Sequence, residues 1–237
     1  MNEKIEVILV DIGNTRIKSA EVVGGALHET RSWESFQQLN DAYGEDIPFM
    51  ICSTSSANIE RNNTLVLSAR TSLPINLNYE TPETLGSDRI AAAVGALEAF
   101  PDQNTLVVDL GTCITMDFVA SDGTFHGGII SPGLKMRMRS MSQFTANLPD
   151  ISQNWNQIAY QAIGKSTKQC LLSGAFGGVV KEIEGTIRQL EKDFTSINVI
   201  LSGGDAPYFE SRLKAHIFAG SKIVLMGLHR VWKHQLT

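Results

Sequence analysis

The sequence IEVILVDIGNTRIK at positions 5–18 decides how the chain begins to fold. Its first half is a short β-branched run that stops at a glycine, which is typical of a buried strand. Gly13-Asn14 and Gly24-Gly25 are turn signals that separate this strand from two further strand-like segments. The chain is therefore predicted to open as a hairpin or meander. The three strands are expected over residues 5–11, 15–23 and 26–33.

The opening pattern returns about a hundred residues later, in the sequence TLVVDLGTCIT at positions 105–115. Each copy is a β-branched strand that ends in an aspartate, Asp11 or Asp109, and is followed by a glycine turn. Self-similarity at this spacing indicates two related α/β lobes. We place the boundary near Gln103-Asn104. The predicted lobes cover residues 1–104 and 105–237.

Further elements are expected between these strands. Ser87 is a predicted N-cap for an alanine-rich helix, and Pro101 ends that helix. Apolar segments predict strands over 47–53, 114–119, 124–130 and 198–201. The expected helices cover residues 34–43, 60–71, 89–100, 134–144, part of 168–192, a segment after 205, and 225–234.

Length and composition exclude several classes of protein. The 237 residues suffice for one large domain or two small ones, and 43% apolar content excludes a disordered chain. We find no apolar run long enough to span a membrane and no secretory signal. A net charge of −5 argues against a nucleic-acid partner. Three widely spaced cysteines predict neither disulfides nor a zinc site, so we expect a reducing, cytoplasmic compartment.

Residues 11–18 have the chemistry of a phosphate-binding loop. Asp11 lies where a buried strand ends, so its carboxylate could hold Mg²⁺ directly or through water. Gly13 lets the backbone approach a ligand closely, while Asn14 and Thr15 can aim N–H and hydroxyl groups at phosphate oxygens. Lys18 adds a positive charge. Taken alone, the segment is equally consistent with an ordinary Gly-Asn hairpin turn.

Two later loops repeat this chemistry. Asp109 is followed by the Gly111-Thr112 turn, so two aspartate-ended strands could face each other across a cleft and grip a triphosphate. The sequence SGGD at 202–205 follows a third apolar strand. Its glycines would let an adenine ring lie close to the backbone. The three loops together, in this order, are a more specific signal than any one of them.

These motifs resemble the actin-like ATPase superfamily of sugar and acetate kinases, actin and chaperone ATPases, and more closely the type III pantothenate kinases. The resemblance covers nearly the whole chain in the family's order and spacing. It implies an α/β fold with two similar ribonuclease H-like lobes, each a mixed sheet with flanking helices, and a cleft between them. The motifs are DIGNTRIK (11–18), GSDR (86–89), DLGTCIT (109–115), GGIISPG (127–133), GKST (164–167) and SGGD (202–205).

The resemblance also implies a role for each matching residue. Asp88 would accept the proton of the pantothenate hydroxyl, and Asp109 would bind a monovalent cation, potassium or ammonium. Thr167 would contact pantothenate, from the other subunit of a homodimer. The remaining pantothenate-binding residues would be Tyr79, Gly86, Ser87 and Arg89. The ATP-binding residues would be Asp11, Ile12, Gly13, Asn14, Thr15, Arg16, Ile17, Lys18 and Thr112, with Mg²⁺ held by Asp11 through water.

Elementary chemistry agrees with these roles. Phosphoryl transfer to an alcohol needs charge neutralisation, positioning and one base near the hydroxyl. Asp88 can be that base, and Arg89 can keep it ionised or clamp the carboxylate of the substrate. The plain structural alternative is an acid at a helix N-terminus beside a surface cation.

We therefore expect an ATP-dependent kinase that converts pantothenate to 4′-phosphopantothenate, the first step of coenzyme A biosynthesis. The expected partners are ATP, pantothenate and a second copy of the chain, with no nucleic acid or membrane. One alternative is a nucleotide-binding regulator of the Bvg accessory factor type, which would have no need of the base at Asp88. The other is a kinase for a different small alcohol.

Overall fold

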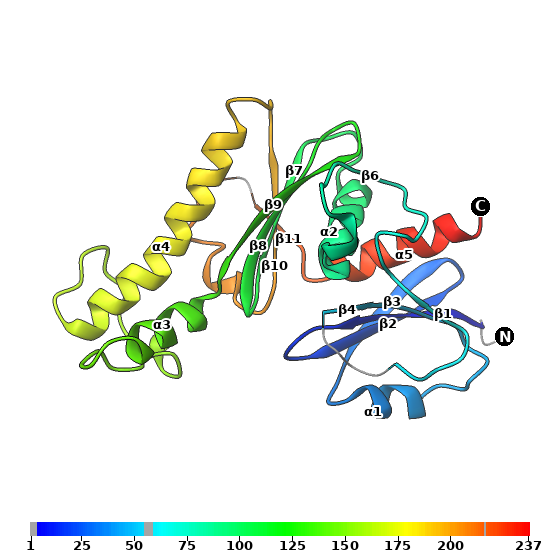
Figure 1. The fold of residues 1–237 in the computed structure, drawn as a ribbon, viewed down its shortest axis with the longest axis horizontal. Helices are drawn as coiled ribbons and strands as arrows, with labels where there is room; N and C mark the ends of the chain where they lie inside the picture. Colours follow the sequence, from blue (N-terminus) through cyan, green and yellow to red (C-terminus); the bar gives the residue numbers. More distant parts are fainter. Residues whose placement is uncertain (1–3, 55–58, 216) are drawn as a thin grey trace. The chain divides into compact units, whose positions relative to one another are not determined.

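The computed structural model describes residues 4–54, 59–215 and 217–237. It is an α/β protein built on two mixed β-sheets, one of five strands and one of six. Figure 1 shows the strands and helices in chain order. By their contacts the residues form two compact units, which we describe separately.

The five-stranded sheet has the order β3-β2-β1-β4-β5. β1 pairs antiparallel with β2 and parallel with β4, so the predicted meander continues into a parallel pair. The β1–β2 hairpin turns through Gly13, whose N–H donates to the carbonyl oxygen of Arg16 at 3.1 Å. The strand bounds are β1 Ile5–Ile12, β2 Ile17–Val23, β3 Ala26–Trp33, β4 Phe49–Ser53 and β5 Thr64–Val66.

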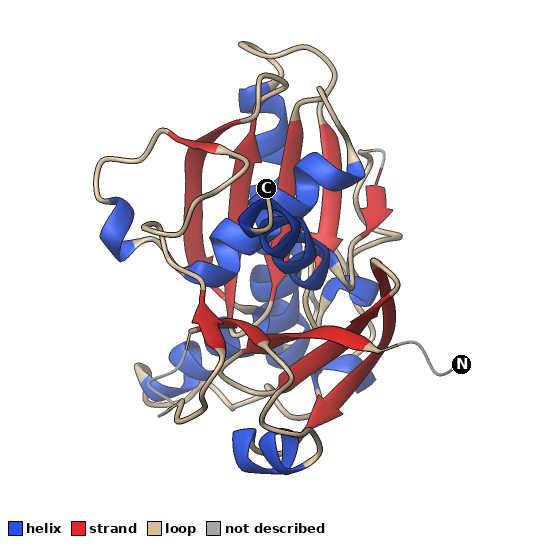
Figure 2. Ribbon diagram, turned by 90° about the vertical axis from the view of Figure 1, so that its right-hand side faces the viewer, coloured by secondary structure: helices blue, strands red, loops and turns tan. Residues whose placement is uncertain are grey.

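Helices cover both faces of this sheet, which explains why the central residues of β1 and β4 are buried without alternation. On one face Leu39 of α1 (Phe36–Asp41) joins a core with Ile8, Val10 and Phe49. Figures 1 and 2 show α1 against this face. The opposite face contacts α2 (Ser87–Ala99) and α5 (Ile223–Gln235).

Helices α2 and α5 pack directly on each other through two glycines, side by side in Figure 1. A Cβ at position 227 would overlap the carbonyl oxygen of Ala91, and one at position 95 would overlap the carbonyl oxygen of Ile223. Only glycine allows backbones to approach this closely. The last helix of the chain is thereby fixed against the first half.

The six-stranded sheet has the order β11-β10-β7-β8-β9-β6. Read from the other edge and without the short edge strand β6, the order is β9-β8-β7-β10-β11. It matches β3-β2-β1-β4-β5 strand for strand, so β7, β8 and β9 take the places of β1, β2 and β3. Asp11 and Asp109 are therefore equivalent, each the second-last residue of its first strand. The strand bounds are β6 Asn76–Leu77, β7 Thr105–Leu110, β8 Cys113–Val119, β9 Thr124–Pro132, β10 Asn198–Ser202 and β11 Ile217–Ala219.

The two compact units are not successive halves of the chain. Residues 1–105, 118–127 and 222–237 form unit 1, and residues 106–117 and 128–221 form unit 2. The chain returns to unit 1 because the end of β8, the start of β9 and the whole of α5 pack there. The predicted halves, 1–104 and 105–237, do not coincide with these units.

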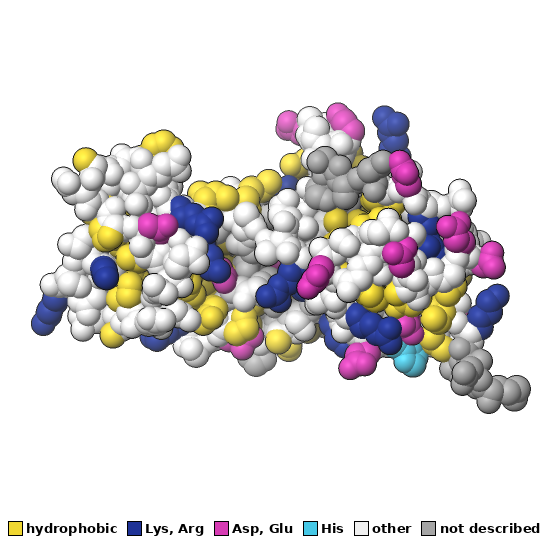
Figure 3. Space-filling view, turned by 90° about the horizontal axis from the view of Figure 1, so that it is seen from below, with side chains coloured by type: hydrophobic (Ala, Val, Ile, Leu, Met, Phe, Trp, Pro, Cys, Tyr) yellow, Lys and Arg dark blue, Asp and Glu magenta, His cyan; other side chains and the backbone are white. Residues whose placement is uncertain are grey.

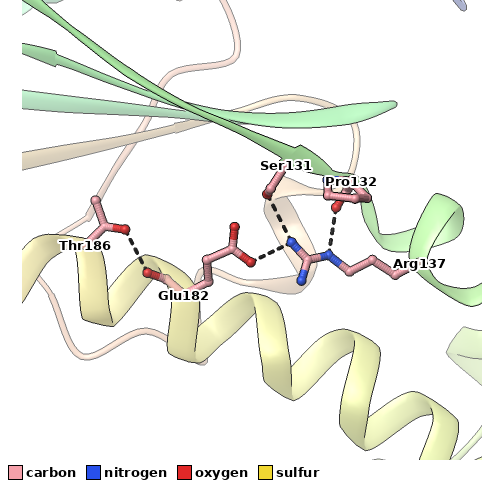
Figure 4. Close-up of polar contacts among 5 residues, drawn as sticks. All are labelled: Ser131, Pro132, Arg137, Glu182 and Thr186. Atoms are coloured by element: carbon pink, nitrogen blue, oxygen red, sulfur yellow. Dashed lines mark hydrogen bonds and ion pairs between the residues drawn. The ribbon is translucent and has the colours of Figure 1, made fainter.

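In unit 2 the helices α3 (Leu134–Gln143) and α4 (Thr167–Leu190) are tied by Arg137. Its guanidinium donates to Glu182 of α4 at 2.5 Å and to Ser131 Oγ and the Pro132 carbonyl at 3.0 and 2.7 Å (Figure 4). Both charged side chains are largely shielded from solvent. The ion pair therefore fixes the end of β9 and the start of α3 against α4.

The structure confirms most of the elements expected from the sequence and corrects three of them. The helix expected over 60–71 is wrong, because Asn63 has a φ of 55° and Leu65 pairs with Met50 of β4. Strand pairing with β4 therefore outweighs the helix-like spacing of apolar residues in this segment.

The other two corrections concern helix ends. Ser87 is not the N-cap, since Gly86 takes that position. The helix after residue 205 is only the 3₁₀ turn Ala206–Tyr208. Strands β6 and β11 were not expected.

Two other short 3₁₀ helices, Pro82–Thr84 and Trp155–Gln157, complete the described elements. Among the described residues, no helix is both long and apolar enough to cross a bilayer.

Candidate functional site

The first expected phosphate loop is the β1–β2 hairpin of unit 1. Asn14, Thr15 and Arg16 are exposed at its tip. Ile12 is only 2% exposed and belongs to the hydrophobic core, so its side chain is turned away from the solvent. The turn therefore offers its backbone and three polar side chains to a ligand, while Ile12 anchors the strand.

Asp11 is held from the neighbouring strand. The parallel register of β1 and β4 places it opposite Cys52, and the thiol donates to its Oδ1 at 3.5 Å. Cys52 is fully buried. Burial, followed by the negative charges of Asp11 and Asp88, raises the pKa of this thiol well above its ordinary value. Cys52 thus remains a protonated donor between two carboxylates, a role that the sequence analysis did not assign to it.

The second expected element of unit 1 is the start of α2. Ser87 accepts a hydrogen bond from the Ser53 N–H at 3.0 Å, and its hydroxyl donates to the Ser53 carbonyl at 3.1 Å. This reciprocal pair joins the end of β4 to the first turn of α2. It also means that the buried Ser87 side chain serves the protein's own structure. Neither Ser53 nor this contact could be read from the sequence, because the two residues lie 34 positions apart.

Asp88 is the carboxylate at the N-terminus of α2. Burial raises its pKa, and the N–H groups of Arg89 and Asp88 and the positive charge of Arg89 partly oppose that rise. Its Oδ1 lies where a side chain on Gly86 would be, since a Cβ there would come within 2.6 Å. The missing side chain of Gly86 therefore leaves room for the carboxylate of Asp88.

Arg89 and Tyr79 lie together next to this carboxylate. The Arg89 guanidinium carbon is 5.9 Å from the ring centres of both Tyr79 and Phe125. Arg89 is only 7% exposed. Unit 1 thus brings together Asp11, Asp88, Arg89 and Tyr79 of the predicted set, and it adds Phe125, which the sequence analysis did not name.

A cavity of about 590 Å³ in unit 1 is bordered by Gly86 and Ser87, the two residues that precede Asp88. Its lining includes Ser53 at the end of β4, Gly86 and Ser87 at the start of α2, and Leu67 and Arg70 of the segment after β5. The cavity therefore borders the segment that the sequence marked as a substrate motif.

Unit 2 contains the second expected phosphate loop. A Cβ on Gly133 would overlap the carbonyl oxygens of Gly111 and Thr112, and Asp109 Oδ2 lies 3.4 Å from the Cβ position of Gly111. The Gly133 N–H donates to the Thr112 carbonyl at 3.1 Å, so the start of α3 packs closely on the β7–β8 turn that follows Asp109. A carboxylate such as that of Asp109 is a hard oxygen donor, which suits an alkali or alkaline-earth cation. The side chain of Thr112 is exposed at the turn.

The glycine loop after β10 packs on this turn within unit 2. The Asp205 N–H donates to the Leu110 carbonyl at 3.0 Å, and Gly203, with a φ of 93°, lies against the same residue. Burial raises the pKa of Asp205, and Lys135 opposes the rise. The predicted SGGD and DLGT motifs are therefore neighbours.

Thr167 is the first residue of α4 in unit 2 and is exposed. The preceding Ser166 is the N-cap and accepts a hydrogen bond from the Gln169 N–H at 3.4 Å. A Cβ on Gly164 would overlap the backbone of Cys170, so the GKST segment folds tightly onto its helix. Thr167 is thereby presented at a rigid helix start.

On the face drawn in Figure 3, acidic and basic side chains are intermingled. Among the described residues, no group of three or more histidine, cysteine, aspartate or glutamate side chains could hold a metal ion by itself. Mg²⁺ that accompanies a nucleotide takes ligands from phosphate oxygens and water as well as from protein carboxylates.

The sequence profile of type III pantothenate kinases matches residues 49–189. A type III pantothenate kinase of Cytophaga hutchinsonii is 39% identical over 97% of this chain and 99% of its own length. The chain belongs to the type III pantothenate kinase family. A family member of Bacteroides fragilis is 38% identical, over 94% of this chain and 96% of its own.

Solved structures support the fold of this family member. A Campylobacter jejuni protein assigned to the Baf family of transcriptional activators superposes with a TM-score of 0.66 at 21% identity, covering 97% of this chain and 98% of its own. A Sinorhizobium meliloti protein assigned as a 2-dehydro-3-deoxygalactonokinase gives 0.60 at 13% identity, covering 97% and 99%. Likenesses at these identities confirm the fold of the sugar kinase and actin-like ATPase type. The pantothenate kinase family assignment rests on the sequence matches.

Proposed function

We propose that this protein transfers the γ-phosphoryl group of ATP to the terminal hydroxyl of pantothenate and so makes 4′-phosphopantothenate. The family relationship, which spans nearly the whole chain, supports the reaction. The observation that carries the proposal is the desolvated Asp88 carboxylate beside the buried guanidinium of Arg89. That pair combines a base for an alcohol with a cation for a carboxylate, and pantothenate has both groups.

Asp88 acts as the proton acceptor. A base is most effective when its pKa lies nearer the working pH than that of an ordinary carboxylate. Burial shifts Asp88 in that direction, while Arg89 and the first N–H groups of α2 favour the ionised form that can accept a proton. As the γ-phosphoryl group arrives, the hydroxyl proton passes to Asp88, and the oxygen–phosphorus bond forms as the bond to ADP breaks.

Arg89 and Tyr79 bind the substrate. A guanidinium can pair with a carboxylate through two hydrogen bonds, and a buried one does so with little competition from water. Gly86 and Ser87 shape the turn that carries the base. The cavity beside them gives room for the rest of an extended small molecule.

ATP is bound by the residues of the two phosphate loops, 11–18 and Thr112. Exposed polar groups at the tip of the first hairpin suit phosphate oxygens. Mg²⁺ accompanying the nucleotide would be held by Asp11 through water, and it would supply neutralisation of the phosphate charge.

A monovalent cation, potassium or ammonium, is held at Asp109. The Asp109 carboxylate, at the end of β7, is a hard oxygen donor of the kind that such an ion prefers. Thr167 contacts pantothenate in a homodimer, and the rigid start of α4 supports such a presentation.

A coupled assay of ADP release with ATP, Mg²⁺ and either K⁺ or Na⁺ tests the proposal. We expect ADP release to require pantothenate and to be faster in K⁺. Asp88→Asn should fold normally and lose about a hundredfold or more in turnover, as expected for the loss of a general base. Wild-type turnover in that variant would overturn the base assignment.

The same assay separates the alternatives. ADP release that is absent or independent of pantothenate would favour the nucleotide-binding regulator. A panel of small alcohols and sugars, with one turned over faster than pantothenate, would show a different acceptor.

A further inference from the structure

We propose that Phe125 is a positioning residue for substrate binding, because it holds the Arg89 guanidinium and the Tyr79 ring in the arrangement that recognises the carboxylate end of the substrate. The inference rests on the proposed function of Arg89 and adds a residue that lies outside the recognised motifs. Phe125 is on β9, two residues before the first glycine of the GGIISPG segment.

The three groups form a nearly equilateral triangle. The Arg89 guanidinium carbon is 5.9 Å from each ring centre, and the two ring centres are 6.1 Å apart with an interplanar angle of 46°. The guanidinium therefore rests against both rings without being sandwiched between them. A guanidinium donates hydrogen bonds in the plane of its edge, and that geometry is compatible with aromatic rings that attract its charge.

Burial lessens the screening of this contact by water. Phe125 is fully buried and Arg89 is 7% exposed, so water does little to screen the attraction between cation and ring. A long arginine side chain normally loses much rotamer entropy when it binds a ligand. Contact with a fixed ring orders the side chain before the ligand arrives, which lowers the entropic cost of binding.

Strand pairing fixes the other two corners of the triangle. The parallel register pairs Leu77 of β6 with Phe125, and the Asn78 N–H donates to the Phe125 carbonyl at 3.0 Å. Tyr79 follows directly and lies over Gly127, whose φ is 84° and whose Cβ position is 3.5 Å from the Tyr79 ring. The two-residue strand β6 therefore sets where the Tyr79 ring lies.

This geometry predicts a selective kinetic effect. Phe125 contacts the groups assigned to substrate binding, whereas Asp88 has its own support from Gly86 and the α2 N-terminus. Removing the contacts of the Phe125 ring with Arg89 and Tyr79 should therefore weaken the binding of pantothenate. The proton transfer to Asp88 should remain largely intact. A role confined to overall stability would not separate KM from kcat in this way.

Phe125→Leu tests the inference, with Phe49→Leu as the matched control. Phe49 is also fully buried and also carries a guanidinium, that of Arg61 at 3.9 Å, but on β4. We expect Phe125→Leu to raise the KM for pantothenate about threefold to thirtyfold, the range for a lost desolvated cation–π contact. The kcat and the KM for ATP should change less than twofold. Phe125→Met, which keeps the volume, replaces the leucine variant if that one does not fold.

A double-mutant cycle with Arg89→Lys then shows whether Phe125 acts through Arg89. In the Arg89→Lys background, the Phe125 substitution should change the KM for pantothenate less than twofold. An unchanged KM in the single Phe125 variant, or an equal KM rise in both backgrounds, would overturn the inference. Neither result would touch the proposed function, which the loss of turnover in Asp88→Asn tests separately.

Discussion

The thiol of Cys52 donates to the carboxylate of Asp11 across the parallel strands β4 and β1, with Sγ and Oδ1 3.5 Å apart. The contact places a buried cysteine beside the first phosphate loop. Its pKa is raised by burial and by two carboxylates, so the thiol is a hydrogen-bond donor and a poor nucleophile.

In the native protein, two of the three cysteines should therefore react with a thiol reagent and Cys52 should not. Cys113 and Cys170 are exposed and Cys52 is buried. A thiol reagent such as 5,5′-dithiobis(2-nitrobenzoate) should titrate two thiols in the native protein and three in denaturant. Cys52→Ser is the control and should give two in both states. Rapid reaction of three thiols in the native wild type would contradict the buried contact.

Gly86→Ala should impair catalysis without unfolding the protein. The backbone of Gly86, at φ −56° and ψ 133°, is accessible to alanine, but the added Cβ would come within 2.6 Å of Asp88 Oδ1. The carboxylate must therefore move. A displacement of a reacting group by about 1 Å can cost roughly a hundredfold, so we expect kcat to fall about tenfold to a hundredfold.

Gly174→Ala on α4 is the matched control for this change, since a Cβ there meets no atom within 4 Å. Its kcat should equal that of the wild type, and its stability should be equal or up to about 1 kcal/mol higher. If Gly86→Ala keeps full turnover, the Asp88 carboxylate does not depend on the open space at Gly86.

Gly227→Ala should destabilise unit 1. The new Cβ would overlap the Ala91 carbonyl and approach the backbone nitrogen of Gly95, so α5 would have to separate from α2. Overpacking costs about 1–3 kcal/mol when side chains can adjust, and backbone atoms cannot, so we expect a loss of about 3 kcal/mol or more. Urea unfolding of this variant beside Gly174→Ala measures the effect. Equal midpoints would show that the two helices do not pack as closely as described.

His229 on α5 should make stability depend on pH. Burial lowers its pKa, Lys233 lowers it further, and Glu98 and Glu6 partly oppose the shift. Within the described residues its Nε2 has no hydrogen-bond partner. The folded protein therefore binds the proton less well than the unfolded chain. Stability should be fully present above the unfolded value of about 6.5 and should fall as the pH drops below it.

His229→Met should flatten this dependence between pH 7.5 and 5.5 in urea unfolding experiments. His234→Gln is the control on the same helix. Unlike Nε2 of His229, Nε2 of His234 has a hydrogen-bond partner, Ser72 Oγ at 3.2 Å. If the free energy of unfolding of His229→Met changes with pH as steeply as that of the wild type, another group takes up the proton.

Local patterns were sufficient to predict both meanders, because each is built from adjacent strands joined by glycine turns. They also marked Asp11, Asp109 and Asp88, since each lies at the end of a strand or the start of a helix. The prediction of a helix over 60–71 was wrong, because Asn63 adopts a left-handed backbone conformation and the residues that follow it pair with β4. A pairing partner that lies at a distance in sequence leaves no trace in local periodicity.

The order of the motifs along the chain determined the family, the paired α/β architecture and the chemical type of each candidate residue. Tertiary structure alone brought the Cys52 thiol to the Asp11 carboxylate and the Ser53 backbone to the Ser87 hydroxyl. It also brought the Phe125 ring to the Arg89 guanidinium and the Tyr79 ring. It also joined the last helix to α2 through Gly227. The physical reason is that a residue's type and neighbours set its local conformation and chemistry. Its burial, its charge environment and its contacts arise only when strands and helices far apart in the chain pack together.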